Sequence, residues 1–182
     1  MSHYHRWFVP GGTYFFTVVT YNRYPFFKDQ SARELLREVW NLTNEKLPFN
    51  NIASVLLHDH FHCLWSLPDG DFDYSTRLKI IKSYFTERWL ERDGHEVMRS
   101  KSQAQRGNRG IWQRRFWEHV IRNEDDLANH FDYIHYNPVK HGYVKQTCHW
   151  PHSTFHRYVK SGHYDLNWGS SCPEAITNWN LE

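Results

Sequence analysis

The stretch that most constrains the fold runs from Val55 to Leu67, where three histidines stand at alternate positions of a largely apolar run. Side chains two residues apart on a β-strand lie on one face, about 6 to 7 Å apart, so this spacing predicts a strand. Two imidazoles on one face can bind a single metal ion. The alternative is a strand whose histidines are only half-buried, and three histidines at this spacing favour the metal site.

The spacing alone leaves open which histidines would bind. His58 and His60 could flank a tight turn with Asp59 at its tip, or His60 and His62 could lie together on the strand that returns from the turn. In the second arrangement the residues at odd positions from 61 to 65 would face a core. Two neutral imidazoles need at least one oxygen ligand to complete a reactive metal site.

A helix that carries such an oxygen ligand is predicted between Leu127 and Pro138. Apolar residues recur there at helical spacing, and Pro138 is expected to end the helix. Tyr133 and Asn137 are four residues apart, so they share a face that lies away from the apolar stripe. Asn137 could supply the oxygen, with Tyr133 one turn earlier beside the metal. The alternative is a core tyrosine followed by an asparagine that stops the helix.

These motifs together resemble the single-tyrosine HUH transposases, and within that superfamily the REP-associated tyrosine transposases of bacteria. The segment from His60 to His62 matches the His-hydrophobic-His motif, and Tyr133 with Asn137 matches the tyrosine helix. Further matching segments cover most of the chain and comprise residues 10–18, 111–119, 133–140 and 150–158. His58 departs from the family pattern, which has an apolar residue or Met before the motif.

The resemblance implies a ferredoxin-like sheet in an HUH endonuclease-type sandwich, with the histidine pair on a central strand and the tyrosine helix beside it. It implies a metal-dependent endonuclease and transposase that cuts and rejoins single-stranded DNA at REP-type hairpins through a 5′-phosphotyrosine. Tyr133 would be the nucleophile, and His60, His62 and Asn137 would bind Mg²⁺ or Mn²⁺. A monomer and a homodimer are both compatible with the family.

The order of predicted elements agrees with such a sheet. Strands are predicted over residues 14–21, 50–57, 60–67 and 111–121, and helices over about 31–46, 75–92 and 123–137. This order predicts an α+β fold whose antiparallel sheet has helices packed on one face. Ser31 is the expected cap of the first helix, and Arg77 is expected on the solvent side of the second.

We expect one catalytic domain over residues 1–150 and a C-terminal tail over 151–182 that contacts DNA or is partly disordered, loosely held from Pro173 onward. The net charge is only +2, but basic residues between Arg99 and Arg122 far outnumber the single acid. Such an excess is typical of a phosphate-binding surface or of a solvated loop. The residues predicted to contact the DNA backbone are Lys82, Arg114, Arg115, Lys140 and Arg157.

Two other functions fit parts of the pattern. A metal-dependent hydrolase could use the three histidines to activate water, but it would leave Tyr133 without a role. A non-catalytic module for single-stranded nucleic acid could use an RRM-like sheet with surface aromatics, but it would leave the ordered histidines, tyrosine and asparagine unexplained.

The sequence shows no feature of a secreted or membrane protein. The three cysteines lack CxxC spacing, residues 1–7 contain no apolar leader, and no run is long enough to span a membrane. We therefore expect a cytoplasmic bacterial protein with no membrane partner.

Overall fold

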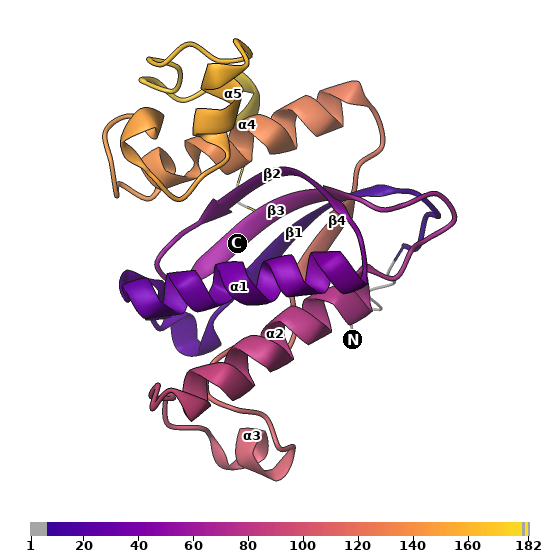
Figure 1. The fold of residues 1–182 in the computed structure, drawn as a ribbon. Helices are drawn as coiled ribbons and strands as arrows, with labels where there is room; N and C mark the ends of the chain where they lie inside the picture. Colours follow the sequence, from indigo (N-terminus) through magenta and orange to yellow (C-terminus); the bar gives the residue numbers. More distant parts are fainter. Residues whose placement is uncertain (1–6, 180, 182) are drawn as a thin grey trace.

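Alternating apolar side chains build a four-stranded antiparallel sheet at the centre of the protein (Figure 1). The computed structural model describes residues 7–179 and 181. The prediction that residues 1–7 contain no apolar leader therefore lies almost entirely outside the described residues. The strands are β1 (Thr13–Val19), β2 (Asn50–Leu56), β3 (His60–Ser66) and β4 (Trp117–Val120). Their order across the sheet is β2-β3-β1-β4, which places β3 and β1 in the middle.

Helices cover both faces of this sheet. The helices are α1 (Gln30–Lys46), α2 (Tyr74–Glu91), α3 (Lys101–Gln105), α4 (Glu124–Lys140) and α5 (Phe155–Lys160), with short 3₁₀ turns at Tyr21–Arg23, Phe26–Lys28, Thr147–His149 and Glu174–Ile176. Helices α1 and α2 pack on one face, whereas α4 and α5 lie on the other (Figure 1). Among the described residues no helix is both long and apolar enough to cross a membrane.

The predicted α+β class and the ferredoxin-like antiparallel sheet are confirmed. The prediction that helices pack on one face holds for α1 and α2 but not for α4. The reason is visible in β1, where Phe16 packs in the core under α1 and α2 and the neighbouring Phe15 packs in the core under α4. Because central strands carry large apolar side chains on both faces, both faces need cover.

The fourth strand is shorter than predicted. Residues 111–121 were expected to form one strand, but only Trp117–Val120 does, and Trp112 forms an isolated bridge with Thr20. The segment from the Trp112 bridge to the start of β4 contains more residues than the segment of β1 opposite it. The hydrogen-bond ladder between the two segments is therefore interrupted. Arg114 and Arg115 lie in this interruption and are exposed.

Two helix ends differ from prediction. The side chain that caps α1 is Asp29, which accepts a hydrogen bond from the Ser31 amide at 2.7 Å, so Ser31 is not the cap. Helix α4 continues through Pro138 to Lys140, and the prediction that Pro138 ends it is wrong. A proline lacks only its own N–H, and the helix resumes when the His141 amide donates to the Asn137 carbonyl at 3.0 Å.

Arg77 was expected in solvent, but it is buried with 2% of its surface exposed. Its guanidinium donates to the carbonyls of Leu47 and Pro48 at 3.1 and 2.8 Å, and to the Asp71 carboxylate at 2.6 Å. These bonds join the start of α2 to the loop after α1. Helical periodicity could not reveal them, because the partners of Arg77 belong to other elements.

We expect Arg77→Ala to lower the free energy of unfolding by about 3 kcal/mol, because the substitution leaves buried carbonyls and a carboxylate without their donor. Urea denaturation would measure the change. Lys79→Ala removes an exposed cation from the same helix and should change stability by no more than about 0.5 kcal/mol. Equal stabilities for the two variants would show that the Arg77 bonds do not hold α2 in place.

Candidate active site

The strand β3 brings His60 and His62 together and leaves His58 apart. Both strand histidines are fully buried, and their ring centroids are 4.9 Å apart. His58 lies in the turn before β3, where its ring contacts Tyr143 and Trp150 at centroid distances of 4.5 and 5.3 Å. Of the two pairings that the spacing left open, the geometry therefore favours His60 with His62.

Each of these two imidazoles is held at its Nδ1 atom. His60 donates to the Asp59 carboxylate at 2.6 Å, and His62 Nδ1 lies 2.9 Å from the Thr17 hydroxyl. Burial opposes ionisation of Asp59, but the hydrogen bonds from His60 and Arg23 lower the pKa of its carboxyl below the usual value. With a proton on Nδ1, each ring presents an Nε2 lone pair, and both Nε2 atoms are buried.

Helix α4 places Tyr133 beside His62. The tyrosine is 1% exposed, and its ring centroid lies 5.4 Å from that of His62 and 6.0 Å from that of Phe15. The Lys140 ammonium donates to the phenol oxygen at 3.0 Å and lies 4.8 Å from the ring centroid. Asn137, one turn after Tyr133, is fully buried together with its Oδ1 atom.

The opposite side of α4 is covered by the C-terminal segment. Phe155, Tyr164 and Ile176 are buried in the same core as Phe131 and Ile134 of α4. Residues from 173 onward, where the sequence predicted a loosely held chain, thus include a buried anchor. Helix α4 is enclosed between the sheet and this segment, as Figure 1 shows.

His135 forms the polar part of this interface. Its Nε2 lies 2.8 Å from the Thr154 hydroxyl and its Nδ1 lies 3.2 Å from the Tyr164 hydroxyl, which donates to the Asp132 carboxylate at 2.5 Å. Burial of His135 lowers its pKa to about 3. The imidazole is therefore neutral in the folded protein over the physiological range of pH.

The end of the C-terminal segment lies against the tyrosine. The Leu181 amide donates to the Tyr133 oxygen at 3.4 Å, and the Thr17 hydroxyl donates to the Leu181 carbonyl at 3.0 Å. Since Thr17 gives its proton to Leu181, its oxygen is an acceptor for the Nδ1 proton of the neighbouring histidine. The Trp179 ring centroid lies 6.1 Å from that of Tyr133 and 4.8 Å from that of His130.

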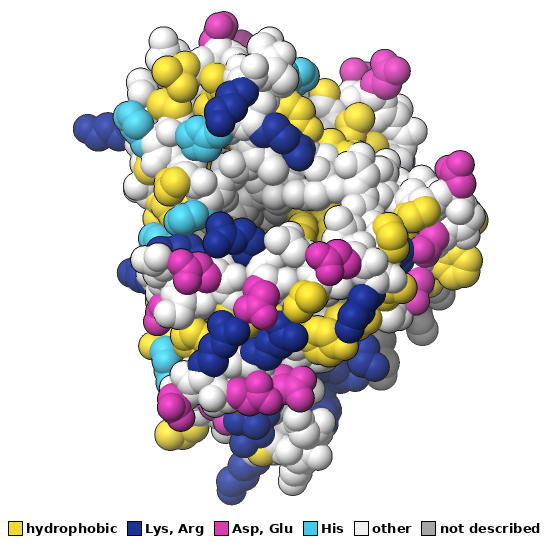
Figure 2. Space-filling model, in the orientation of Figure 1, with side chains coloured by type: hydrophobic (Ala, Val, Ile, Leu, Met, Phe, Trp, Pro, Cys, Tyr) yellow, Lys and Arg dark blue, Asp and Glu magenta, His cyan; other side chains and the backbone are white. Residues whose placement is uncertain are grey.

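The residues predicted to contact DNA do not gather in one place. Lys82 donates to the carbonyls of Gln113 and Arg114 at 2.6 and 3.2 Å, so it joins α2 to the interrupted edge segment. Arg114 and Arg115 are exposed there. Figure 2 shows basic and acidic side chains interspersed over the face that α1 and α2 cover, so this face carries no uniform positive charge.

The remaining two residues predicted to contact DNA, Arg157 and Lys140, form hydrogen bonds within the protein. Arg157 donates to the carbonyls of Asn51 and Ile52 in β2 and to the Tyr158 hydroxyl, which joins α5 to the sheet edge. Lys140 is bonded to the tyrosine, as described above. DNA contact by these five cations stays a prediction.

One histidine near the site was missed from the sequence. His141 caps the C-terminus of α4, and its ring centroid lies 5.2 Å from that of His60. Its position four residues after Asn137 was the available signal, because residues four apart share a helix face. The prediction that Pro138 ends the helix removed that signal.

Comparison with known proteins agrees with this geometry. A REP-associated tyrosine transposase of Escherichia coli K12 is 43% identical over 168 residues, which are 92% of this chain and 91% of the relative. A Haemophilus influenzae protein whose name assigns it to the same family is 44% identical over 171 residues, 94% of this chain and 95% of that one. No family model matches the chain.

A solved structure of a REP-associated tyrosine transposase bound to a REP hairpin is similar to this one over 96% of both chains. The TM-score is 0.77 and the sequence identity is 41%. At this identity and coverage the likeness extends to the whole arrangement of sheet and helices.

The buried His135 should make folding sensitive to acid. The unfolded chain binds a proton at this imidazole below about pH 6.5, whereas the folded protein binds one only near pH 3. Stability should therefore fall on acidification between these values, by up to about 1.4 kcal/mol per pH unit. Urea denaturation at about pH 6 and about pH 4 measures how much the free energy of unfolding falls between these two values. We expect this fall to be smaller for His135→Gln than for the wild type. The exposed His149→Gln variant should behave as wild type, and an unchanged pH dependence of His135→Gln would contradict this account.

Proposed function

The chain belongs to the REP-associated tyrosine transposase family, and on that premise we propose that it cuts and rejoins single-stranded DNA at REP-type hairpins through a 5′-phosphotyrosine at Tyr133. The observation that carries the proposal is the packing of the Tyr133 ring against His62, with Lys140 at the phenol oxygen. The related structure bound to a REP hairpin supports the choice of substrate.

In the proposed reaction the Tyr133 oxygen attacks a phosphorus atom of the DNA backbone. The phenol gives up its proton to solvent as a bond forms between this oxygen and phosphorus. The bond from phosphorus to the 3′ oxygen breaks, and this oxygen takes up a proton from solvent to give a free 3′-hydroxyl. The reverse reaction rejoins the ends without a nucleotide cofactor, because the phosphotyrosine keeps the energy of the phosphodiester. A positioned nucleophile of this kind gains its rate from alignment.

We assign Lys140 two roles in this reaction, one at the attacking phenol oxygen and one at the DNA phosphate. Its ammonium, 3.0 Å from the Tyr133 oxygen, stabilises the phenolate that attacks. The same charge attracts the backbone phosphate, which agrees with the DNA contact predicted from the sequence. The residue is exposed, so a phosphate can approach it from solvent.

The donor set of the site fits a divalent metal ion. His60 and His62 present Nε2 atoms whose direction is set by the bonds at Nδ1, and Asn137 adds an amide oxygen. Two nitrogens and one oxygen suit Mn²⁺, and Mg²⁺ is the alternative that prefers oxygen. An ion bound there would supply a Lewis acid for the scissile phosphate. Asp59 and Thr17 contribute by holding the two rings in place.

The other two functions considered from the sequence receive less support. A hydrolase that relies on three histidines would need His58 beside the other two, but its ring packs on Tyr143 and Trp150. A purely binding module gives no reason for two imidazoles, a phenol and an amide to be buried together. Burying polar groups costs free energy unless they are bonded, so such a group indicates a function.

Access to the tyrosine requires a movement of the C-terminal segment. Tyr133 is 1% exposed, and Trp179 and Leu181 lie against it. A DNA phosphate can reach the phenol oxygen only after these residues leave. Two hydrogen bonds and the packing of Trp179 hold the covered form, at about 1 kcal/mol for each interaction.

The nucleophile is tested by Tyr133→Phe, which keeps the ring and removes the attacking oxygen. With labelled single-stranded hairpins and Mn²⁺, denaturing gels of the wild type should show a band of DNA linked to protein, and the variant should show none. Tyr136→Phe, three residues later on the same helix, is the matched control and should retain the band. Metal-dependent cutting that persists in Tyr133→Phe would indicate hydrolysis by water instead.

Shortening the chain after Thr177 should raise the rate of cleavage. The truncation removes Trp179 and Leu181 but retains the buried Ile176, so the fold should persist. Two hydrogen bonds and a ring contact at about 1 kcal/mol each correspond to an increase on the order of a hundredfold. Single-turnover cleavage would measure it, with the exposed Asn178→Ala as a control. A folded truncated chain that cleaves no faster would show that the segment does not limit access.

A further inference from the structure

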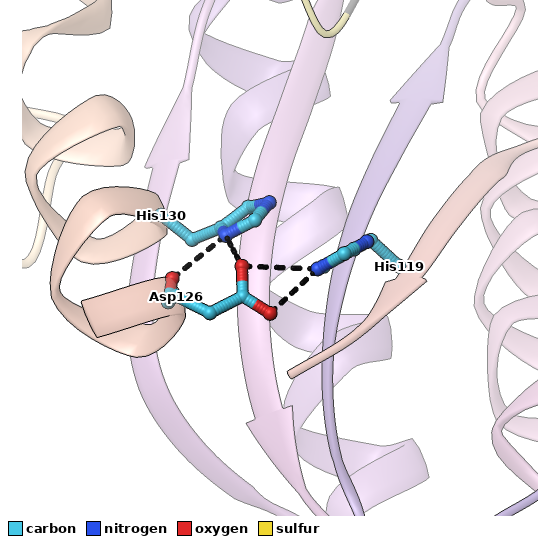
Figure 3. A group of neighbouring side chains, drawn as sticks. All are labelled: His119, Asp126 and His130. Carbon is cyan, nitrogen blue, oxygen red and sulfur yellow. Dashed lines mark hydrogen bonds and ion pairs between the residues drawn. The ribbon is translucent and has the colours of Figure 1, made fainter. Parts of the chain in front are cut away.

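A second group of metal-binding side chains lies between β4 and α4. We name it the β4–α4 cluster, and it consists of His119 on β4 with Asp126 and His130 on α4 (Figure 3). His119 Nε2 lies 3.0 and 2.8 Å from the two oxygens of Asp126, and His130 Nδ1 lies 3.0 Å from one of them. One ligand atom from each residue fits within 4.8 Å of the others.

Neighbouring groups hold these three side chains in place. The Arg122 amide donates to Asp126 at 2.9 Å, and the rings of His119 and His130 are stacked with centroids 4.5 Å apart. The Trp117 ring stacks on the outer side of His119. Since the rings and the carboxylate already converge, little ordering is needed to bind an ion.

The burial of the cluster suits an ion that exchanges slowly with solvent. His130 is 2% exposed, whereas the side chains of His119 and Asp126 are 20% and 16% exposed, which leaves a path for entry. His130 Nε2 is buried and has no hydrogen-bond partner within the described part of the chain. The His130 Nδ1 atom also lies 2.8 Å from the Asp126 carbonyl. Metal binding replaces this hydrogen bond, because the proton moves from Nδ1 to Nε2 and Nδ1 becomes a ligand.

We propose that the β4–α4 cluster binds a second divalent transition-metal ion, of the Zn²⁺ or Mn²⁺ class, through His119 Nε2, one Asp126 oxygen and His130 Nδ1. Two imidazoles and a carboxylate are a common ligand set for these ions. The proton of His119 Nε2 moves to its Nδ1, so both rings bind as neutral ligands. The ion joins the start of α4 to β4, and α4 carries Tyr133 one turn after His130.

This ion is separate from the one proposed for His60, His62 and Asn137. The Phe15 ring lies between the two groups, with its centroid 5.3 Å from that of His62 and 4.8 Å from that of His130. No ligand is shared. The second site therefore acts on the position of α4 and does not contact the scissile phosphate in the proposed reaction.

Metal titration tests the second site without any cleavage assay. Titration of the full chain with Co²⁺, followed by its visible absorption, should show one equivalent fewer for His119→Gln than for the wild type. In a His60→Gln/His62→Gln background, adding His119→Gln should weaken the remaining Co²⁺ binding at least tenfold, on the order expected when a ligand is lost. The exposed His149→Gln variant is the matched control and should bind as the wild type does.

A second readout covers the case in which the buried double variant fails to fold. Zn²⁺ should raise the thermal midpoint of the Tyr133→Phe chain, which lacks the proposed nucleophile, by more than it raises that of Tyr133→Phe/His119→Gln. Equal Co²⁺ stoichiometry and equal Zn²⁺ shifts with and without His119 would overturn the proposal. Loss of DNA cleavage bears only on the proposed function, so the two can fail independently.

Discussion

The burial of two imidazoles in the central strand is the constraint on which the rest of the structure depends. Polar ring atoms inside a sheet must find partners, and each histidine of β3 does so through a residue that the fold brings beside it. Asp59, in the turn before the strand, bonds to His60, and Thr17 bonds to His62 because β1 pairs with β3 at that position. The sheet order β2-β3-β1-β4 is thus a condition for the site as well as for the core.

Helix α4 completes the site, and it is held in position by packing on two sides. Its inner side sets Tyr133 against His62, and its outer side is held by the C-terminal segment through Phe131 and the bonds of His135. The same C-terminal segment then returns and places Leu181 against the phenol. One stretch of chain therefore both supports the helix and covers its tyrosine, so support and access are coupled.

Local patterns in the sequence predicted those parts of the protein that depend on neighbouring residues. Alternation at His60 and His62 predicted the strand, and the spacing of Tyr133 and Asn137 placed both on one face of a helix. Features that depend on distant residues were missed. The burial of Arg77 depends on carbonyls at the end of α1 and in the following loop, and the β4–α4 cluster forms only when a strand and a helix pack together. The spacing of Asp126 and His130 was readable, but nothing in the sequence indicated their nearness to His119.

The most direct measurement of the central claim is to locate the covalent bond. Tandem mass spectrometry of the protein after reaction with a labelled hairpin and Mn²⁺ would identify the modified residue among the 11 tyrosines of the chain. Trypsin should release residues 123–140 as one peptide that contains both Tyr133 and Tyr136, and fragment ions distinguish the two. We expect the 5′-phosphate adduct on Tyr133. An adduct on Tyr136, on another tyrosine, or on none of them in a reaction that has cut the DNA would contradict the assignment.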